Sequence, residues 1–299
     1  MSQPATQSAD AGASAGPRRL GVLGWPVAHS RSPAMHNAAL HALGLDRDGW
    51  RYQLLPVPPE RLAETARALP AAGFAGANVT IPHKHAALEI ADSATEPARA
   101  IGAANTLTFC PDGSIEAENT DAPGFLAALG VSPKDMTALV LGAGGSARAA
   151  VWALREAGAR EVSVWNRTPE RATELARDLD VRAVPHPEGA DLLVNCTSVG
   201  LHPADDAGEI SAPAGLQQSA TGREALNSLE LTFDQVGIYA HVVDFVYNSA
   251  PTPLLAAARA HGAHAVGGLE VLLGQGALSF EIWTGRPAPL EIMRAALAG

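Results

Sequence analysis

A glycine-rich turn over residues 142–147 is the clearest place in the sequence where residue type and spacing predict a chemistry. An apolar run at 138–141 leads directly into it, and a helix-forming stretch follows. The first glycine allows a tight turn, and the second lets a pyrophosphate approach the backbone. The free amides and positive dipole at the helix start then face the phosphates. We therefore expect a dinucleotide site on Gly142, Ala143, Gly144, Gly145, Ser146 and Ala147.

The tip of the next expected strand, 161–165, indicates which dinucleotide binds. An NAD site usually carries a carboxylate about 20 residues after the turn, which holds the ribose 2′-hydroxyl. Here the strand is followed by Asn166, Arg167 and Thr168, and none of the three is acidic. The planar guanidinium of Arg167 suits a 2′-phosphate instead. The sequence therefore favours NADP(H) as the cofactor.

A small polar segment at 195–200 follows the third expected strand of this half. Thr197 and Ser198 are candidates to lie along the nicotinamide ribose. Cys196 beside them is expected to be a small buried residue rather than a nucleophile. It is one of only two cysteines, with Cys110, which excludes a disulfide framework and favours a reducing compartment such as the cytoplasm.

Polar side chains also gather at strand ends in the first 121 residues. Ser30 and Ser32 precede a helix that opens with Pro33, and such a helix start can cradle a carboxylate. Simple capping of the helix by Ser32 is the alternative. Further candidates are Asn78, Thr80, Lys84, Asn105 and Asp121. Each alone is explained as a turn residue, whereas together they suit a polyhydroxylated ligand.

The elements that must position these residues alternate between short apolar runs and helical stretches, which predicts an α/β fold with mostly parallel strands. Expected strands lie at 20–23, 50–54, 76–79, 106–109, 138–141, 161–165, 191–194 and 241–245. Expected helices lie at 33–43, 59–69, 84–91, 124–128, 147–157, 169–179 and 269–284. A turn at 111–113 predicts a hairpin to a strand near Ile115. Residues 1–17 are typical of a disordered tail, and 202–235 of an elaborated loop.

Composition limits the classes of partner. The 299 residues exceed what one domain core usually holds, so two domains are expected. The chain has 31 Asp and Glu against 21 Lys and Arg, and this formal charge of −10 disfavours binding to nucleic acid or anionic membranes. The sequence contains no run of eighteen apolar residues, which is about the length needed to span a bilayer. No metal is expected either. Two pairs of histidines are candidate ligands, His83 with His85 and His261 with His264, but neither pair is accompanied by a cluster of acids or cysteines.

The polar clusters and the turn, in this order, resemble the shikimate dehydrogenase family. The similarity runs from near residue 20 to near 285, over 24–33, 76–84, 101–107, 119–121, 142–148, 166–168, 195–200, 244–247 with Thr252 and Pro253, and 268–275. It implies two α/β domains around a cleft. A substrate-binding catalytic domain would comprise 18–120 and 268–299, and a Rossmann-like NADP-binding domain 121–267. The implied reaction is the reversible NADPH-dependent reduction of 3-dehydroshikimate to shikimate, in the chorismate route to aromatic amino acids.

The resemblance also implies roles for single residues. Ser30 and Ser32 would hold the substrate carboxylate. The ring hydroxyls would be bound by Asn78, Thr80, Asn105, Asp121 and Gln275. Lys84 and Asp121 match the catalytic pair, with Lys84 as general acid and base. Tyr247 matches a substrate-side tyrosine, and Gly268 belongs with the cofactor residues.

Some points stay open at this stage. In the family, a smaller polar residue is frequent at the position of Trp25, and a methionine often lies beside the nicotinamide at the position of Val271. His83 and Ser146 are variable choices. These departures bear on cofactor affinity and rate. A quinate/shikimate dehydrogenase with wider substrate choice is one alternative function. A non-catalytic sensor of a metabolite and a nucleotide is another, although binding alone needs no proton donor. The oligomeric state is open between a monomer and a homodimer.

Overall fold

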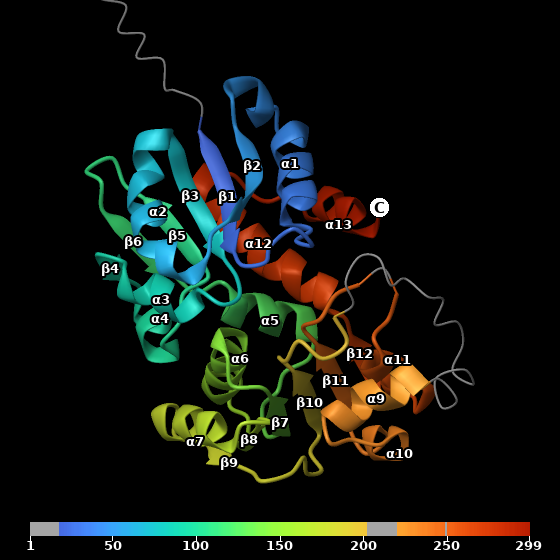
Figure 1. The fold of residues 1–299 in the computed structure, drawn as a ribbon. Helices are drawn as coiled ribbons and strands as arrows, with labels where there is room; N and C mark the ends of the chain where they lie inside the picture. The colour runs from blue at the N-terminus through green and yellow to red at the C-terminus, as the bar shows by residue number, and fades with distance from the viewer. Residues whose placement is uncertain (1–17, 202–219, 249) are drawn as a thin grey trace, which may run out of the picture.

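The protein is an α/β structure with two six-stranded sheets in the computed structural model, which describes residues 18–201, 220–248 and 250–299 (Figure 1). One sheet is formed by strands up to residue 118 and the other by strands from 137 to 266. The predicted α/β class with mostly parallel strands is confirmed. The tail expected at 1–17 lies outside the described residues.

The first sheet is mixed and has the strand order β2-β1-β3-β5-β6-β4. Its strands are β1 (Arg19–Gly24), β2 (Arg51–Pro56), β3 (Phe74–Val79), β4 (Ser93–Ala94), β5 (Thr106–Phe109) and β6 (Ile115–Glu118). Strand β1 lies between β2 and β3 and is parallel to both, whereas β5 is antiparallel to β3. The predicted hairpin is confirmed, because β5 and β6 pair antiparallel with Phe109 opposite Ile115.

Helices cover both faces of the first sheet. They are α1 (Ser32–Ala42), α2 (Leu62–Ala68), α3 (Lys84–Glu89) and α4 (Glu96–Ile101), with α12 (Gly268–Thr284) and α13 (Leu290–Ala298) from the end of the chain. One core cluster joins Leu20 and Val22 to α1, α12 and α13, and another joins Leu23 and Val79 to α2 and α3. The C-terminal helices therefore pack with the first sheet.

The second sheet is entirely parallel and has the order β12-β11-β10-β7-β8-β9. Its strands are β7 (Thr137–Leu141), β8 (Glu161–Trp165), β9 (Arg182–Ala183), β10 (Leu192–Asn195), β11 (His241–Asp244) and β12 (His264–Val266). Counted from β7, this is the 3-2-1-4-5-6 order of a Rossmann sheet. Its topological switch point lies between β7 and β10, where the turn at 142–147 and the segment at 195–200 emerge.

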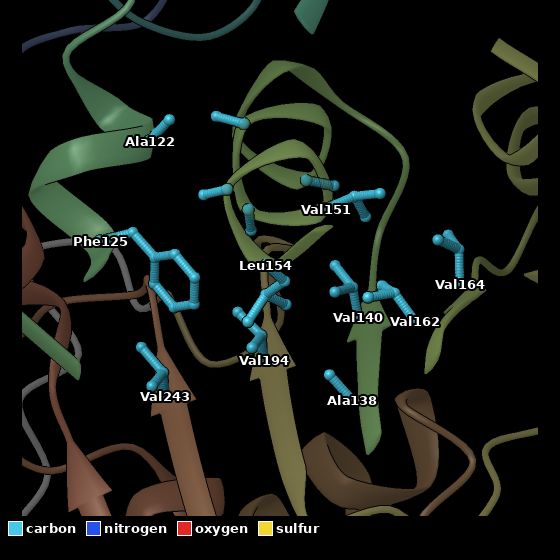
Figure 2. Close-up of a cluster of buried hydrophobic side chains, with 14 of the residues drawn as sticks. Ala122, Phe125, Ala138, Val140, Val151, Leu154, Val162, Val164, Val194 and Val243 are labelled. Atoms are coloured by element: carbon cyan, nitrogen blue, oxygen red, sulfur yellow. The ribbon is translucent and has the colours of Figure 1, made fainter. Parts of the chain in front are cut away.

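Valines on one face of this sheet hold the helix that follows the glycine turn. The helices of this half are α6 (Gly145–Glu156), α7 (Pro169–Asp178), α9 (Ala220–Ser228), α10 (Phe233–Val236) and α11 (Pro253–Ala260). Figure 2 shows Val140, Val162 and Val194 on the side of the sheet that faces Val151 and Leu154 of α6, and all five side chains are buried. Because α6 is fixed in this way, its N-terminus is fixed at the switch point.

The prediction of an irregular loop over 202–235 is wrong for its described part. Helix α9 places Leu226 in the core, and α10 begins with a capping box of Thr232 and Gln235. Only a few apolar residues anchor these helices, so the sequence carries little helical periodicity there. Residues 202–219 lie outside the described residues.

Two helices meet where the halves of the molecule join. Helix α5 (Asp121–Leu129) packs against α12 between the two sheets (Figure 1). A Cβ added at Gly124 would lie 2.4 Å from the backbone nitrogen of Gln275, so only glycine allows this close approach of the two helices. Asp121 and Gln275 are therefore held on adjoining backbones.

His36 is buried in the first half without a hydrogen-bond partner among the described residues. Its ring stacks on Tyr52 with centroids 4.2 Å apart, and burial lowers its pKa from 6.5 to about 3. The unfolded chain therefore binds a proton below pH 6.5 that the folded chain does not bind. We expect this residue to reduce the free energy of unfolding by about 1.4 kcal/mol for each pH unit from 6.5 toward 3.

In the parent protein, Asp244 opposes this loss of stability at low pH. Burial raises the pKa of Asp244 from 3.8 to about 6, so its contribution to stability grows as pH falls from 6 to 3.8. The measurement that tests this expectation is urea unfolding of the parent and of His36→Phe, each at pH 7 and at pH 5. The stability advantage of the variant should grow toward pH 5, and an advantage independent of pH would contradict the assignment to His36.

Candidate functional site

A cavity of about 150 Å³ between the two sheets brings together all nine residues predicted to bind substrate. They are Ser30, Ser32, Asn78, Thr80, Lys84, Asn105, Asp121, Tyr247 and Gln275. They come from the carboxyl end of β3, from the segments after β1 and β11, from the residue before β5, from the starts of α1, α3 and α5, and from α12. Parallel strands of both sheets thus direct their carboxyl ends toward one space, as ligand sites in α/β proteins do.

Lys84 and Asp121 form an ion pair in the wall of this cavity. Each begins its helix, α3 or α5, and Lys84 Nζ lies 2.5 Å from Asp121 Oδ2. The side chains are only 11% and 7% exposed. The other carboxylate oxygen, Oδ1, accepts a hydrogen bond of 2.9 Å from Asn105 Nδ2. Because both carboxylate oxygens are engaged, Asp121 has one orientation and holds the ammonium at a defined place.

A buried hydrogen-bond network fixes the amides around this pair. Asn105 Nδ2 also donates to Gln275 Oε1 at 3.1 Å. Asn78 accepts from the Tyr52 hydroxyl and donates to Ser279 Oγ, each at 2.8 Å. Neither Tyr52 nor Ser279 was predicted from the sequence. The supporting contacts mean that Asn78 and Asn105 present fixed donors and acceptors rather than rotating freely.

Ser30, Ser32 and Tyr247 form a second polar corner. Ser30 Oγ lies 3.3 Å from both the hydroxyl and the amide nitrogen of Ser32. Burial raises the pKa of Tyr247, and a hydrogen bond with Ser30 opposes that rise. The residue that caps α1 is Arg31, with no side-chain cap, so the alternative of capping by Ser32 is wrong. The hydroxyls are therefore available for an anion at the helix start.

The glycine turn has the form that a pyrophosphate needs. Gly142 has φ of +111°, which favours glycine, and a Cβ there would lie 3.2 Å from the Cys196 backbone. A Cβ added at Gly144 would meet no described atom within 4 Å, so open space lies in front of the turn. No side chain of the described ranges caps the start of α6. The free amides and the open space fit a phosphate group.

Arg167 lies exposed just after β8, beside the turn that Asn166 shapes by donating to the Thr168 carbonyl at 2.9 Å. In the described part of the chain its guanidinium has no hydrogen-bond or ion-pair partner. Arg171, in the first turn of α7, is a second exposed cation that the sequence argument missed. The sequence signal that could have identified Arg171 is its spacing of four residues from Arg167. Both cations suit an anionic group at the carboxyl edge of the sheet.

Buried polar side chains support the segment after β10. Asn195 Oδ1 accepts from the backbone amide and the hydroxyl of Thr197, at 3.0 and 2.7 Å. Asn195 Nδ2 donates to Asp244, which also accepts from Thr252 at 2.5 Å. Cys196 was expected to be buried. It is only half-buried, because it lines the cavity. Burial raises the pKa of its thiol, so a thiolate nucleophile is disfavoured.

The predicted cofactor residues divide into two groups. Those that line the cavity are Ser146, Thr197, Ser198 and Gly268. Those that lie outside its lining are Gly142, Ala143, Gly144, Gly145, Ala147, Asn166, Arg167 and Thr168. The remaining lining residues are mainly apolar, among them Phe245, Val271 and Leu272. Of these three, only Val271 was singled out from the sequence. They give the cavity an apolar wall next to Gly268.

The described residues contain no cluster of three or more His, Cys, Asp or Glu that could hold a metal ion. His83 Nε2 instead lies 2.7 Å from the Val57 carbonyl, and His85 Nδ1 lies 2.9 Å from that of Gly102. Within the described ranges, no helix has both the length and the apolar character required to cross a membrane.

Comparisons with known proteins agree over most of the chain. Residues 22–107 match the shikimate dehydrogenase substrate binding domain, 127–197 match shikimate/quinate 5-dehydrogenase, and 268–298 match the shikimate 5′-dehydrogenase C-terminal domain. A relative named shikimate dehydrogenase (NADP(+)) from Anaeromyxobacter sp. (strain K) is 47% identical, over 93% of this chain and 94% of its own.

Solved structures show the same relationship. The chain is 41% identical to shikimate 5-dehydrogenase from Thermus thermophilus in complex with NADP(H) and shikimate, with a TM-score of 0.78 and 93% and 98% of the two chains covered. It is also 31% identical to the 5-ketofructose reductase of Gluconobacter sp. strain CHM43, with a TM-score of 0.72 and 93% and 97% covered. With a shared fold and up to 47% identity over nearly its full length, the chain belongs to the shikimate dehydrogenase (NADP(+)) family.

Proposed function

We propose that this chain is an NADP-dependent shikimate dehydrogenase that interconverts 3-dehydroshikimate and shikimate, on the chorismate route to aromatic amino acids. The observation that carries the proposal is the Lys84–Asp121 pair in the wall of the cavity. A proton donor held by a carboxylate is what reduction of a ring carbonyl needs, whereas ligand binding alone does not require one.

Lys84 handles the proton in both directions of the reaction. NADPH, when bound, supplies the hydride to the ring carbonyl carbon. Negative charge then develops on the carbonyl oxygen, where the Lys84 ammonium stabilises it and donates a proton. In the reverse direction the neutral amine accepts the proton of the ring hydroxyl. Asp121 keeps Lys84 in place during this step through the 2.5 Å contact.

The other polar corners of the cavity orient the substrate. Ser30 and Ser32 bind its carboxylate at the start of α1, supported by the neighbouring Tyr247 hydroxyl. The ring hydroxyls are bound by Asn78, Thr80, Asn105 and Gln275. An anion at one end and a general acid at the other define which ring carbon faces the cofactor.

The second sheet binds the cofactor. The turn at 142–147 would hold the pyrophosphate of NADP(H), Arg167 the 2′-phosphate, and Thr197, Ser198 and Gly268 the nicotinamide end. On this basis we assign 18–120 with 268–299 to the substrate domain and 121–267 to the NADP-binding domain. The two boundaries fall at the starts of α5 and α12, the helices that pack on each other between the sheets.

A spectrophotometric assay of the reduced-nicotinamide absorption tests the proposal. Shikimate and quinate are each offered with NADP⁺ and NAD⁺, and shikimate with NADP⁺ should give the highest kcat/KM. Comparable rates with quinate would favour the broader quinate/shikimate enzyme. 5-Ketofructose with NADPH is the control for the Gluconobacter relative, and it has no carboxylate for Ser30 and Ser32. Tight binding of shikimate without turnover would instead indicate a sensor.

A further inference from the structure

Ser146 joins the two halves of the site through a side-chain contact. It stands in the first turn of α6, on the second sheet, yet its Oγ lies 2.9 Å from Nζ of Lys84 in the first half. The stem of the lysine packs on the same turn, because a Cβ added at Gly145 would lie 2.8 Å from Lys84 Cβ. Lys84 is thus held by both halves.

The two partners of Lys84 determine the direction of its remaining donor. An ammonium group has three N–H donors in tetrahedral directions and no acceptor. One donates to Asp121 at 2.5 Å and one to Ser146 at 2.9 Å. These two bonds fix rotation about the Cε–Nζ bond, so the third N–H has a single direction. Lys84 lines the cavity, where this third donor is the one left for a reacting oxygen.

We propose that Ser146 is a positioning residue for proton transfer by Lys84, an inference that rests on the proposed function. Its backbone amide belongs to the open helix start that suits a phosphate, whereas its hydroxyl accepts from the lysine. The two groups therefore serve different partners. Without the hydroxyl, the ammonium keeps only Asp121, and the flexible four-carbon stem lets it turn away from the reacting oxygen.

The kinetic test uses Ser146→Ala with Ser146→Thr as the conservative variant. Alanine should lower kcat about tenfold, as loss of one hydrogen bond to a charged group implies. KM for shikimate should change little, and the solvent deuterium isotope effect on kcat should increase because proton transfer becomes slower. Threonine keeps a hydroxyl and should restore kcat and the isotope effect. Ser163→Ala is the matched control, because its hydroxyl lies on β8 outside the cavity lining.

Binding measurements separate this role from cofactor binding. Calorimetric titration should give the same Kd for NADP⁺ in the parent and in Ser146→Ala. A weaker NADP⁺ affinity with unchanged kcat would show that the hydroxyl serves the cofactor, and would overturn the proposal. Unchanged kcat with unchanged affinity would overturn it too.

A crystal structure of Ser146→Ala gives a readout that does not depend on turnover. Lys84 Nζ should leave its position beside Asp121 or occupy more than one position, whereas an unmoved, well-ordered Nζ would overturn the proposal. If the parent enzyme does not oxidise shikimate, the proposed function fails. The position of Nζ then decides by itself whether Ser146 holds the lysine.

Discussion

Replacing Lys84 with alanine should lower kcat for shikimate oxidation by about 10²–10⁴-fold, the usual contribution of general acid–base catalysis, while shikimate still binds. The amine lies in the cavity wall, 2.5 Å from a carboxylate oxygen of Asp121. Shikimate affinity should largely persist, because Ser30, Ser32 and Asn78 reach the ligand independently of Lys84. Steady-state kinetics and calorimetric titration of shikimate measure the two quantities separately.

The sequence contains a matched control for this experiment. Lys134 is the chain's other lysine, and it is exposed before β7, away from the cavity lining. Lys134→Ala should leave kcat and KM unchanged. Near-normal kcat in Lys84→Ala would refute the proton-transfer role. A loss of shikimate binding with little change in kcat would show instead that Lys84 is a binding residue.

Parts of the site that one short segment encodes were predictable from the sequence. The conformation of the turn at 142–147 depends only on residues within it, since Gly142 takes a positive φ and the following residues begin a helix. The hairpin is equally local, because the turn at 111–113 sets the pairing of Phe109 with Ile115. The polar strand ends gathered in one cavity because both sheets direct carboxyl ends toward it.

Contacts between distant segments could not be predicted. Asn78 and Ser279 are 201 residues apart, and a serine on a helix looks the same in sequence whether it contacts Asn78 or solvent. The contact of Lys84 with Ser146 joins different halves and has no local signal either. Apolar lining residues such as Phe245 resemble ordinary core residues. For these positions, only the packing of α5 on α12 and the approach of α6 to the start of α3 determine what each side chain meets.

The helices missed near residue 225 illustrate a limit of periodicity. Helix α9 includes Gly222, which lowers helix propensity, and buries Leu226. Its stability must come from packing on α11 rather than from its own sequence. An argument from sequence pattern alone therefore assigns this stretch to a loop, although the capping box of Thr232 and Gln235 was a usable local signal.

Replacing Arg167 with alanine should reduce kcat/KM for NADP⁺ by roughly 10²-fold, since charge-assisted contacts to a phosphate are lost. Among the described residues the guanidinium has no hydrogen-bond or ion-pair partner, so its removal breaks no such contact within that part of the fold. NAD⁺ lacks the 2′-phosphate, and its kcat/KM should therefore stay unchanged. Initial rates with each cofactor at saturating shikimate measure the ratio within a single variant.

The same variant also distinguishes cofactor recognition from damage to the fold. If rates with NADP⁺ and NAD⁺ fell together, Arg167 would be supporting the turn after β8 rather than reading the phosphate. If neither changed, Arg171 would be the cation that binds it, and Arg171→Ala would then show the loss expected for Arg167. Arg177→Ala, at the far end of α7 beside Asp178, removes an exposed arginine from the same helix and should alter neither rate. A selective loss for NADP⁺ alone would mean that this half of the protein chooses its cofactor by charge at the strand tip, in place of the carboxylate that an NAD site would carry there.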